Sequence, residues 1–364
     1  MSDTLTEKGS TEGMVDYNEN SQAQRQNANR HAGLIRDLAA RVSGLSDQLN
    51  ITDYGCGPGQ SAVDTVSPAV EHWFETRPDK QLSVCHADQP GNDWNALMKL
   101  IHGPEGYLKG DAAVQVRTSV GSFYERMMPD QSVTLATCFT ASHWLSATLR
   151  LNAPETVWFA DLTGENRSAM WAQAEADWKR FLRLRAEELQ PGGYLLVSTL
   201  GAVPEPGEIN EVAASGRGIY RALQHVTEEM ATEGLLKRET ADHFVFGLWF
   251  MTSDEARRPI ETDPFLSKAY EIDTLEAANV DESGDLFSTF IDSPDEYARK
   301  YAGYVRAFAC STLRSQLFAP SAGSEADIDA LETEFFGRLE RLYREKTSDF
   351  AFEQWFTTIV LKRR

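Results

Sequence analysis

The sequence predicts an α/β fold in which a parallel sheet carries helices on both faces and an inserted helical cap lies over the sheet. Three observations predict this fold. Short apolar runs alternate with amphipathic helical patterns through the first 200 residues, which is typical of a parallel sheet. A glycine-rich turn follows the first apolar run. After Leu200 the patterns are mainly helical and rich in aromatic residues.

The spacing of apolar residues predicts the elements of the first half. Leu34, Ile35, Leu38 and Ala39 recur at helical spacing, so we expect a helix over 21–41. Strands are expected where short apolar runs end in turn residues, and helices where the period lengthens to that of a helix. The expected strands are 49–54, 82–87, 113–116, 132–139 and 193–200, and the helices between them are 62–77, 92–101 and 169–189.

The second half opens with a turn-rich break at 201–207. The alternation of polar and apolar residues in the segment AYEIDTL predicts a half-buried strand, and Ser-Asp-Glu at Ser253 is a helix start. The expected elements are a helix over 208–234, an aromatic stretch at 244–251, a helix from Ser253, a strand at 269–275, helices at 294–318 and 325–346, and a last strand at 354–362.

These elements predict the domain organisation of the 364 residues. Residues 1–13 are polar and are expected to form a flexible segment. We assign 14–200 and 264–364 to the core, and 201–263 to a helical cap to which part of 278–320 also contributes. A chain of this length is sufficient for one large domain with an insertion.

Charge and cysteine content narrow the function classes. The net charge is −20, and so negative a surface repels phosphate backbones and anionic lipid, which argues against nucleic acid or a membrane as partner. Cys56, Cys85, Cys138 and Cys310 have the spacing of neither a disulfide framework nor a zinc site. No signal peptide pattern and no run of about 18 apolar residues is present. We therefore expect a cytoplasmic protein with free thiols.

The clearest motif is D-Y-G-C-G-P-G at 53–59, where a strand ends and a helix begins. Its glycines let the backbone turn sharply and approach a ligand. Asp88 ends the next strand, where a carboxylate can accept both hydroxyls of a ribose. The loop alone leaves a NAD-dependent oxidoreductase open. The turn at 189–193 before a strand, and the strand that closes the chain, recur in methyltransferase sheets and favour S-adenosylmethionine (SAM) over NAD.

Four further motifs occur in a fixed order. They are Y-x-x-N-S-x-x-Q at 17–24, D-x-P-G-N-D-x-N at 88–95, G-S-F-Y at 121–124 and H-W-L-S at 143–146. This set strongly resembles the SABATH family, the methyltransferases of salicylic, benzoic and jasmonic acid and of theobromine. The resemblance covers about residues 14–364. A shortened glycine-rich stretch before Tyr17, Thr140 in place of an aromatic residue, and the altered loop at 57–61 indicate a distant, microbial member.

The resemblance implies a Rossmann-like class I SAM-dependent methyltransferase fold, with the acceptor between sheet and cap and S-adenosylhomocysteine as product. It places Ser21 and Asp53 near the methionine of SAM, Asp88 and Gln89 at ribose and adenine, and Phe123 over the adenine. Dimers are common in the family, so a homodimer is expected. The expected cofactor-binding residues are Tyr17, Ser21, Asp53, Gly55, Gly57, Gly59, Ser61, Asp88, Gln89, Ser122 and Phe123.

Gln24 and Trp144 match the two side chains that hold the acceptor carboxylate in this family. An amide and an indole offer N–H donors without charge, and a carboxylate is already ionised at neutral pH. Such a reaction needs positioning and not a general base. We name Gln24, Trp144 and His143 as catalytic candidates, although His143 is more often a pocket-lining residue. The expected substrate-binding residues are Gln24, Phe139, Thr140, His143, Trp144, Ile219, Tyr220, Trp249, Phe250 and Val305.

The preferred function is therefore SAM-dependent methylation of a small carboxylic acid to its ester by direct in-line transfer. N-methylation of a xanthine-like heterocycle is the alternative on the same fold. A NAD-dependent oxidoreductase and a SAM-binding protein without activity are alternatives of other classes. No metal site is expected from the sequence, and a supporting magnesium ion is left open.

Overall fold

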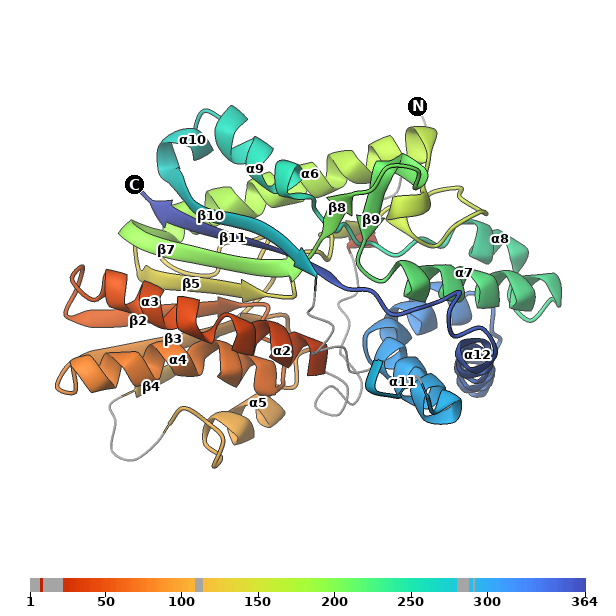
Figure 1. Cartoon of the computed structure of the whole chain (residues 1–364), viewed down its shortest axis with the longest axis horizontal. Helices are drawn as coiled ribbons and strands as arrows, with labels where there is room; N and C mark the ends of the chain where they lie inside the picture. Colours follow the sequence, from red (N-terminus) through yellow and green to blue (C-terminus); the bar gives the residue numbers. More distant parts are fainter. Residues whose placement is uncertain (1–6, 9–21, 109–113, 280–287, 291) are drawn as a thin grey trace.

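The computed structural model describes residues 7–8, 22–108, 114–279, 288–290 and 292–364 (Figure 1). Within them, seven strands form one sheet in the order β10-β11-β7-β5-β2-β3-β4. The strands β4, β3, β2, β5 and β7 are parallel, and β11 is antiparallel to both of its neighbours. The strands are β2 (Gln48–Tyr54), β3 (Gln81–Asp88), β4 (Val114–Val120), β5 (Val133–Phe139), β7 (Leu189–Leu200), β10 (Tyr270–Asn279) and β11 (Trp355–Arg363).

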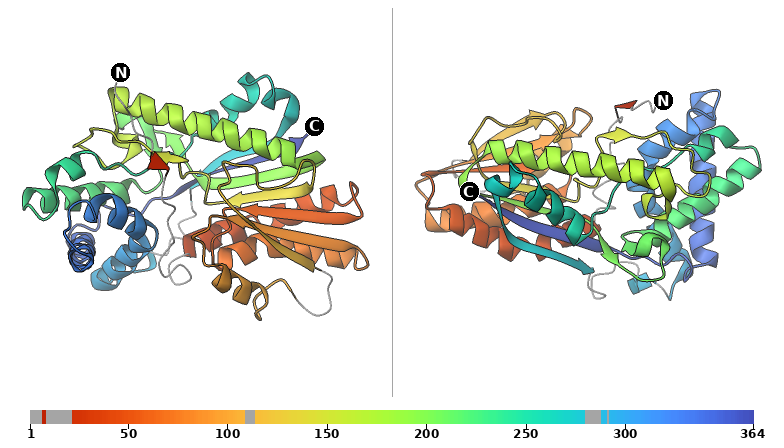
Figure 2. Two further views of the ribbon diagram at one scale, coloured as in Figure 1. Left: turned by 180° about the vertical axis from the view of Figure 1, so that it is seen from behind. Right: turned by 90° about the horizontal axis from the view of Figure 1, so that it is seen from above.

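Helices cover both faces of this sheet (Figures 1 and 2). Successive residues of a strand point to opposite faces, so Tyr194 and Leu196 of β7 join one buried cluster while Leu195 and Val197 join the other. One face carries α2 (Gln22–Arg30), α3 (Ala32–Val42) and α4 (Gln60–Thr76), with α5 (Trp94–Ile101) packed against α4. The other carries α6 (Gly164–Glu188), α9 (Ser253–Thr262) and α10 (Leu266–Ala269).

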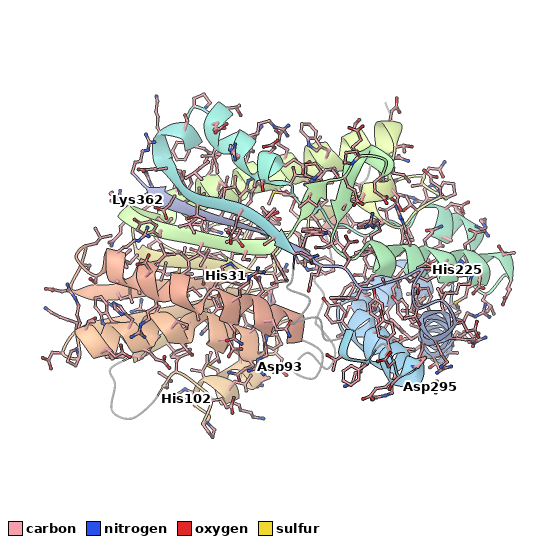
Figure 3. All side chains as sticks on the ribbon, in the orientation of Figure 1. His31, Asp93, His102, His225, Asp295 and Lys362 are labelled. Atoms are coloured by element: carbon pink, nitrogen blue, oxygen red, sulfur yellow. The ribbon has the colours of Figure 1, made fainter. Side chains whose placement is uncertain are left out.

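A second, helical lobe lies beyond one end of the sheet (Figure 1). His225 and Asp295 lie in this lobe, whereas His31, His102 and Lys362 lie in the sheet lobe (Figure 3). The long helix α12 packs against both α11 and α7. The lobe consists of α7 (Arg217–Thr232), α8 (Arg238–Asp242), α11 (Pro294–Thr312), a π-helical turn (Leu313–Phe318) and α12 (Glu325–Glu345).

This arrangement differs from the predicted domain division at two points. The range assigned to the cap includes α9, yet α9 packs on α6 and β10 over the sheet because it buries Ala256, Pro259 and Ile260 there. Conversely, α12 belongs to the helical lobe although its residues are assigned to the core, whereas α11 lies within the range 278–320, part of which is expected in the cap. Residues 1–13 lie outside the described residues, except for the short strand β1 (Glu7–Lys8) that pairs with β6 (Ala147–Thr148).

Most of the predicted elements are present, and the clearest difference is at 208–234. There the helix begins only at Arg217, after a small hairpin of β8 (Ala202–Pro204) and β9 (Val212–Ala214). Gly207 and Gly216 adopt positive φ angles of 96° and 73°, so the chain turns at both sites instead of continuing as a helix. The predicted first helix is likewise divided at His31. Short 3₁₀ turns occur at Phe159–Asp161, Ile209–Glu211 and Ser288–Phe290.

Candidate active site

The glycine-rich loop lies at the carboxyl end of β2, beside the end of β3. Gly55 and Gly57 have φ angles of 70° and 63°, a conformation that side chains disfavour. A Cβ on Gly55 would lie 2.4 Å from Cβ of Ala141. The Gly55 N–H donates to the carbonyl of Ala87 at 2.7 Å, and Gly59 caps the start of α4. The loop is therefore held close to β3, with the first turn of α4 beside it.

Asp88, the last residue of β3, is fixed by backbone donors on two sides. Its Oδ2 accepts from the Gly57 N–H at 2.6 Å, and its Oδ1 accepts from the Gln89 N–H at 2.7 Å. Burial raises the pKa of Asp88, while these two N–H groups act in the opposite direction. The Asn92 amide donates to the Gly57 carbonyl at 3.3 Å and braces the same loop. The carboxylate is thus oriented before any ligand arrives.

Asp53 lies deeper, at the end of β2, and is 2 % exposed. Its Oδ1 accepts from the Thr137 hydroxyl at 2.9 Å. Its Oδ2 lies 3.6 Å from Nδ1 of His86 and has no hydrogen-bond partner among the described residues. Asp53 also lines the large cavity at this edge of the sheet. A buried carboxylate oxygen without a donor is costly, so this position suits a ligand that carries an N–H or a positive charge.

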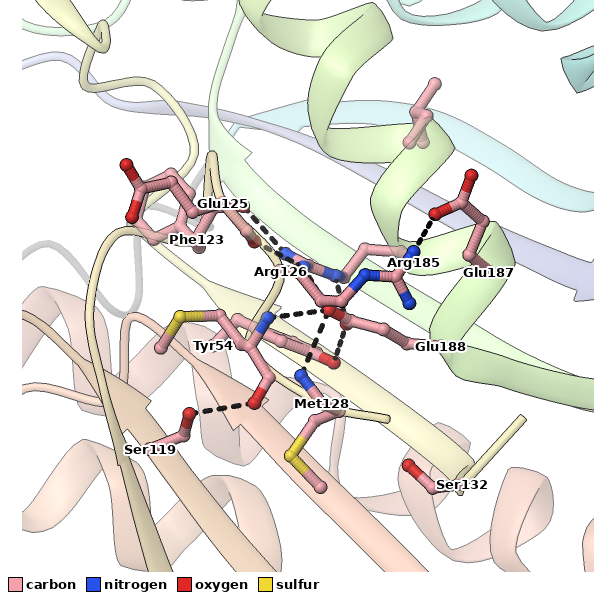
Figure 4. Close-up of polar contacts among 12 residues, drawn as sticks. Tyr54, Ser119, Phe123, Glu125, Arg126, Met128, Ser132, Arg185, Glu187 and Glu188 are labelled. Carbon is pink, nitrogen blue, oxygen red and sulfur yellow. Dashed lines mark hydrogen bonds and ion pairs between the residues drawn. The ribbon is translucent and has the colours of Figure 1, made fainter. Parts of the chain in front are cut away.

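Phe123 lies on a loop that is held from behind by a buried ion pair (Figure 4). Arg185 and Glu188, at the end of α6, are 0 % exposed. Arg185 donates to the Phe123 carbonyl at 2.7 Å and to the Glu125 carbonyl at 3.0 Å. Glu188 accepts from the Met127 and Met128 N–H groups at 2.8 and 3.1 Å, and from the Tyr54 hydroxyl at 2.6 Å. The pair therefore fixes both halves of the loop.

A cavity of about 800 Å³ extends from the glycine loop toward the helical lobe. Trp144 lines its wall, and two hydrogen bonds fix the Trp144 backbone. The Trp144 N–H donates to the Ala141 carbonyl at 3.1 Å, and the Tyr124 hydroxyl donates to the Trp144 carbonyl at 2.6 Å. The wall of this cavity also includes Asp53, Gly55, Gly57, Ser61, Asp88, Gln89, Ser122, Phe123, Phe139, Thr140, Phe308, Thr312 and Gln316.

A second cavity of about 40 Å³ lies on the other side of Trp144. Trp144, Thr140 and Phe308 line both cavities, so they form the wall between the two spaces. Most of the second cavity is apolar and aromatic. It is lined further by His143, Leu200, Ser215, Gly216, Ile219, Tyr220, Phe250, Tyr304, Phe352, Glu353 and Gln354.

His143 is buried beside this wall and is held neutral. Burial lowers the pKa of His143 to about 3. Its Nδ1 is 3.1 Å from the Thr199 hydroxyl, and its ring packs 5.7 Å from that of Trp144 and 5.4 Å from that of Phe250. A group with so low a pKa is a weak base at neutral pH. The position suits support of Trp144 better than proton transfer.

Comparison with known proteins identifies the family to which this site belongs. The sequence family described as SAM dependent carboxyl methyltransferase matches residues 2–364. The chain belongs to this family. Gibberellic acid methyltransferase 1 of Arabidopsis thaliana is 25 % identical over 73 % of this chain and 74 % of its own. Indole-3-acetate O-methyltransferase 1 of Oryza sativa subsp. japonica is 25 % identical over 94 % of this chain and 88 % of its own.

A solved structure shares the fold of this carboxyl methyltransferase. Loganic acid methyltransferase with SAH superposes with a TM-score of 0.75 at 20 % identity, over 99 % of each chain. The resemblance to the SABATH family, the α/β fold and SAM as methyl donor are therefore confirmed. The NAD-dependent alternative is set aside.

Three groups at the glycine-loop edge of this methyltransferase are suited to binding SAM. Asp53 offers a carboxylate oxygen that has no partner in the described part of the chain, Asp88 offers an oriented carboxylate, and Phe123 offers an aromatic ring beside the glycine loop. Among the described residues no group of three His, Cys, Asp or Glu side chains is placed to hold a metal ion. In the same described part of the chain, no helix is long and apolar enough to cross a membrane.

The structure brings most of the predicted site residues together, with six exceptions. Tyr17 and Ser21 lie outside the described residues. Gln24 lies in α2, and its side chain is not among those described. Gly59 caps α4 but lines neither cavity.

Two predicted substrate-binding residues, Trp249 and Val305, line neither cavity. Trp249 instead packs 4.8 Å from the Phe159 ring, with Arg167 at 5.0 Å over its own ring. Val305 is fully buried in the core of the helical lobe.

Sequence reasoning missed the stripe of α11 that faces both cavities. Tyr304, Phe308 and Thr312 lie four residues apart, and Gln316 continues the row in the π-helical turn. Residues four apart share one helix face, so Val305 lies on a different face from Tyr304. The spacing was available in the sequence, but the side of the helix that meets the site was not. Gln354, at the junction of the lobe with β11, had no sequence signal.

Proposed function

We propose that this methyltransferase esterifies a small, largely apolar carboxylic acid held between the sheet and the helical lobe. The observation that carries the proposal is the place of Trp144. Trp144 lines both cavities, and its backbone is anchored on both sides. The relatives named above as gibberellic acid and indole-3-acetate methyltransferases support a carboxylate as acceptor.

Trp144 and Gln24 hold the carboxylate in this proposal. Neutral N–H donors orient a carboxylate while leaving one of its oxygens free to react. SAM supplies a methyl group that is already activated on a sulfonium. Because the acid is ionised at neutral pH, the protein has only to align the free oxygen and exclude water. His143 acts as a positioning residue, since its ring packs against Trp144 and its pKa of about 3 leaves it neutral.

The glycine-loop edge is the cofactor site in this proposal. Asp53 pairs with the methionine end, Asp88 and Gln89 with the ribose and adenine, and Phe123 with Ser122 covers the adenine. The resemblance to the family also assigns Tyr17 and Ser21, which lie outside the described residues, to cofactor binding. Gly55, Gly57 and Gly59 let the backbone approach the ligand, and Ser61 lies in the first turn of α4 at the wall of the large cavity.

The acceptor's apolar body lies in the large cavity, and only its end remote from the carboxylate reaches the aromatic and aliphatic side chains of the second cavity of about 40 Å³. Ile219, Tyr220 and Phe250 line the second cavity, and Phe139 and Thr140 line the large one. Large apolar surfaces with few polar groups bind ligands of the same character. The site therefore favours acids with an aromatic or terpenoid body over small hydrophilic acids.

The test is a panel of carboxylic acids and xanthines incubated with SAM, with mass detection of each methylated product. Methyl esters without methylated xanthines are expected. Trp144→Phe, which removes the indole N–H and keeps an aromatic ring, should lower kcat/KM for the acids at least about tenfold. SAM affinity measured by calorimetry should stay within about twofold. Methylated xanthines without any ester, or full activity of Trp144→Phe, would refute the carboxylate assignment.

A further inference from the structure

The wall of the second cavity contains a buried polar atom that has no partner among the residues that the structure describes. Gln354 lines this cavity and is 4 % exposed. Its Nε2 donates to the Tyr304 hydroxyl at 3.4 Å, whereas its Oε1 is buried and has no hydrogen-bond partner within the described residues. A buried amide oxygen in this state costs free energy comparable to a lost hydrogen bond. Such a cost inside a substrate pocket points to a ligand that relieves it.

The neighbouring polar groups of the same wall are already paired. The Glu353 carboxylate accepts from Arg217 Nη2 at 2.9 Å and from Trp355 Nε1 at 3.0 Å. The Ser215 hydroxyl donates to the Trp355 carbonyl at 2.5 Å and accepts from the Trp355 N–H at 2.6 Å. These side chains hold the chain at the start of β11, where it leaves the helical lobe for the sheet (Figure 1). They therefore fix the backbone beside Gln354 and leave its amide oxygen for another partner.

The Gln354 amide oxygen can only accept a hydrogen bond. Gln354 lies in irregular backbone just before β11, so no helix of its own offers it an N–H group. Its position also differs from that of the carboxylate-holding Trp144, which separates the two cavities. A molecule that presents its carboxylate to the large cavity would therefore reach Gln354 only with its opposite end.

We propose that Gln354 recognises a hydrogen-bond donor, a hydroxyl or a ring N–H, at the end of the acid remote from its carboxylate. This rests on the proposed function, because it assumes that the acceptor is a carboxylic acid. The cavity volume of about 40 Å³ exceeds the roughly 10–15 Å³ that a single water needs, so it accommodates a small polar substituent with its carbon. The substrate class is a hydroxylated or N–H-bearing acid with an apolar middle.

The experiment compares matched acids that differ only in the remote donor. Phenylacetate is paired with its 3- and 4-hydroxy derivatives, and octanoate with 8-hydroxyoctanoate, so that two lengths are sampled. The methoxy derivatives supply an acceptor in place of the donor. For each acid we would measure kcat/KM, and calorimetric binding to the enzyme saturated with S-adenosylhomocysteine. At least one hydroxy acid should be preferred over its parent by at least about tenfold in both measurements.

Gln354→Met keeps the length of the side chain and removes its hydrogen-bonding groups. The preference for the hydroxy acid should fall to within about twofold, while the parent acid should bind equally well or better because no orphan oxygen remains. General damage to the pocket would instead weaken both acids together. Gln224→Met is the matched control, since that side chain donates to the Pro154 carbonyl on the outside of the lobe, and it should leave every ratio unchanged.

The possible outcomes distinguish a failure of this inference from a failure of the proposed function. If no acid yields an ester, the proposed function fails and the role of Gln354 falls with it. If parent acids are esterified but Gln354→Met leaves every hydroxy-to-parent ratio as in the wild type, only the role of Gln354 is refuted. If Gln354→Met selectively lost activity with the methoxy acids, the proposed role would also be refuted. The wild-type side chain would then present its donor Nε2, and not its acceptor Oε1, to the substrate.

Discussion

Glu188→Gln is expected to weaken both the fold and the cofactor site, through the loop that carries Phe123. The variant keeps the shape of the side chain and removes one charge of a fully buried pair. Glu188 contacts Arg185 twice, at 2.7 and 2.8 Å. Removing one partner of a buried ion pair costs about 3–5 kcal/mol, because the other charge is left uncompensated. The lower end of this range applies to Glu188→Gln, because Arg185 would still donate to the Phe123 and Glu125 carbonyls and would still lie 4.1 Å from the Tyr54 ring centroid.

We therefore expect the free energy of unfolding to fall by about 3 kcal/mol in urea titrations. SAM affinity should fall about tenfold by calorimetry, because the neutral amide introduced in place of the Glu188 carboxylate would replace only part of the anchoring of Met127 and Met128. The neighbouring variant Glu187→Gln is the matched control. Its partner is the half-exposed Arg126, and exposed pairs contribute little.

The two variants together decide whether the buried pair holds the loop. Equal unfolding free energies for Glu188→Gln and Glu187→Gln, with wild-type SAM affinity in both, would refute the reasoning. A loss of stability at unchanged SAM affinity would leave the pair structural and remove its link to the cofactor. Arg185→Met should resemble Glu188→Gln in both measurements, because it removes the other half of the same contact.

Three further predictions concern the site. Asp88→Asn should lower SAM affinity at least about tenfold by calorimetry, because a charged acceptor is lost; unchanged affinity would remove Asp88 from the cofactor site. Gly55→Ala should lower the free energy of unfolding by at least about 2 kcal/mol, since its positive φ and the contact with Ala141 both oppose a Cβ. Gly33→Ala, a helical site with open space around it, should be neutral or stabilising, and equal losses in both would contradict the steric argument. Because the pKa of His143 is about 3 when folded and near 6.5 when unfolded, the unfolded chain binds more protons between these values. Wild-type stability should therefore fall by about 2 kcal/mol more than that of His143→Asn between pH 7 and pH 5, and parallel pH curves would contradict burial of a neutral ring.

The sheet was predictable because each strand carries a local signal that burial then enforces. β5 is buried along its whole length, and its apolar run is visible in the sequence without any knowledge of its neighbours. The hairpin of β8 and β9 carries no such signal. Its three-residue strands are too short for a periodic pattern, and the turns at Gly207 and Gly216 depend on positive φ angles that sequence spacing does not reveal.

The candidate site divides in the same way. Asp53, Asp88 and the glycine loop were predictable because they lie at or just after strand ends, which meet at one edge of a parallel sheet. The lobe side was less predictable, because it depends on which face of a helix meets the site. The choice of Val305 over its neighbour Tyr304 shows the difference, since one residue rotates a side chain by about 100° around the helix.

Because His143 is neutral, the rate of methyl transfer is expected to depend on the geometry of the site and not on the protonation of this ring. With a pKa of about 3, this ring does not ionise in the range where a carboxylate acceptor is already charged, so it neither gains nor loses a proton during transfer. The rate then depends on geometry, and geometry here depends on the wall shared by the two cavities. Trp144 is anchored through Ala141 and Tyr124, and Tyr124 follows Phe123 on the loop that Arg185 and Glu188 hold in place. The same loop therefore supports the Phe123 ring beside the glycine loop and the backbone of Trp144, which we propose holds the acceptor. This shared support is why a buried ion pair outside both cavities should affect the alignment of the two substrates.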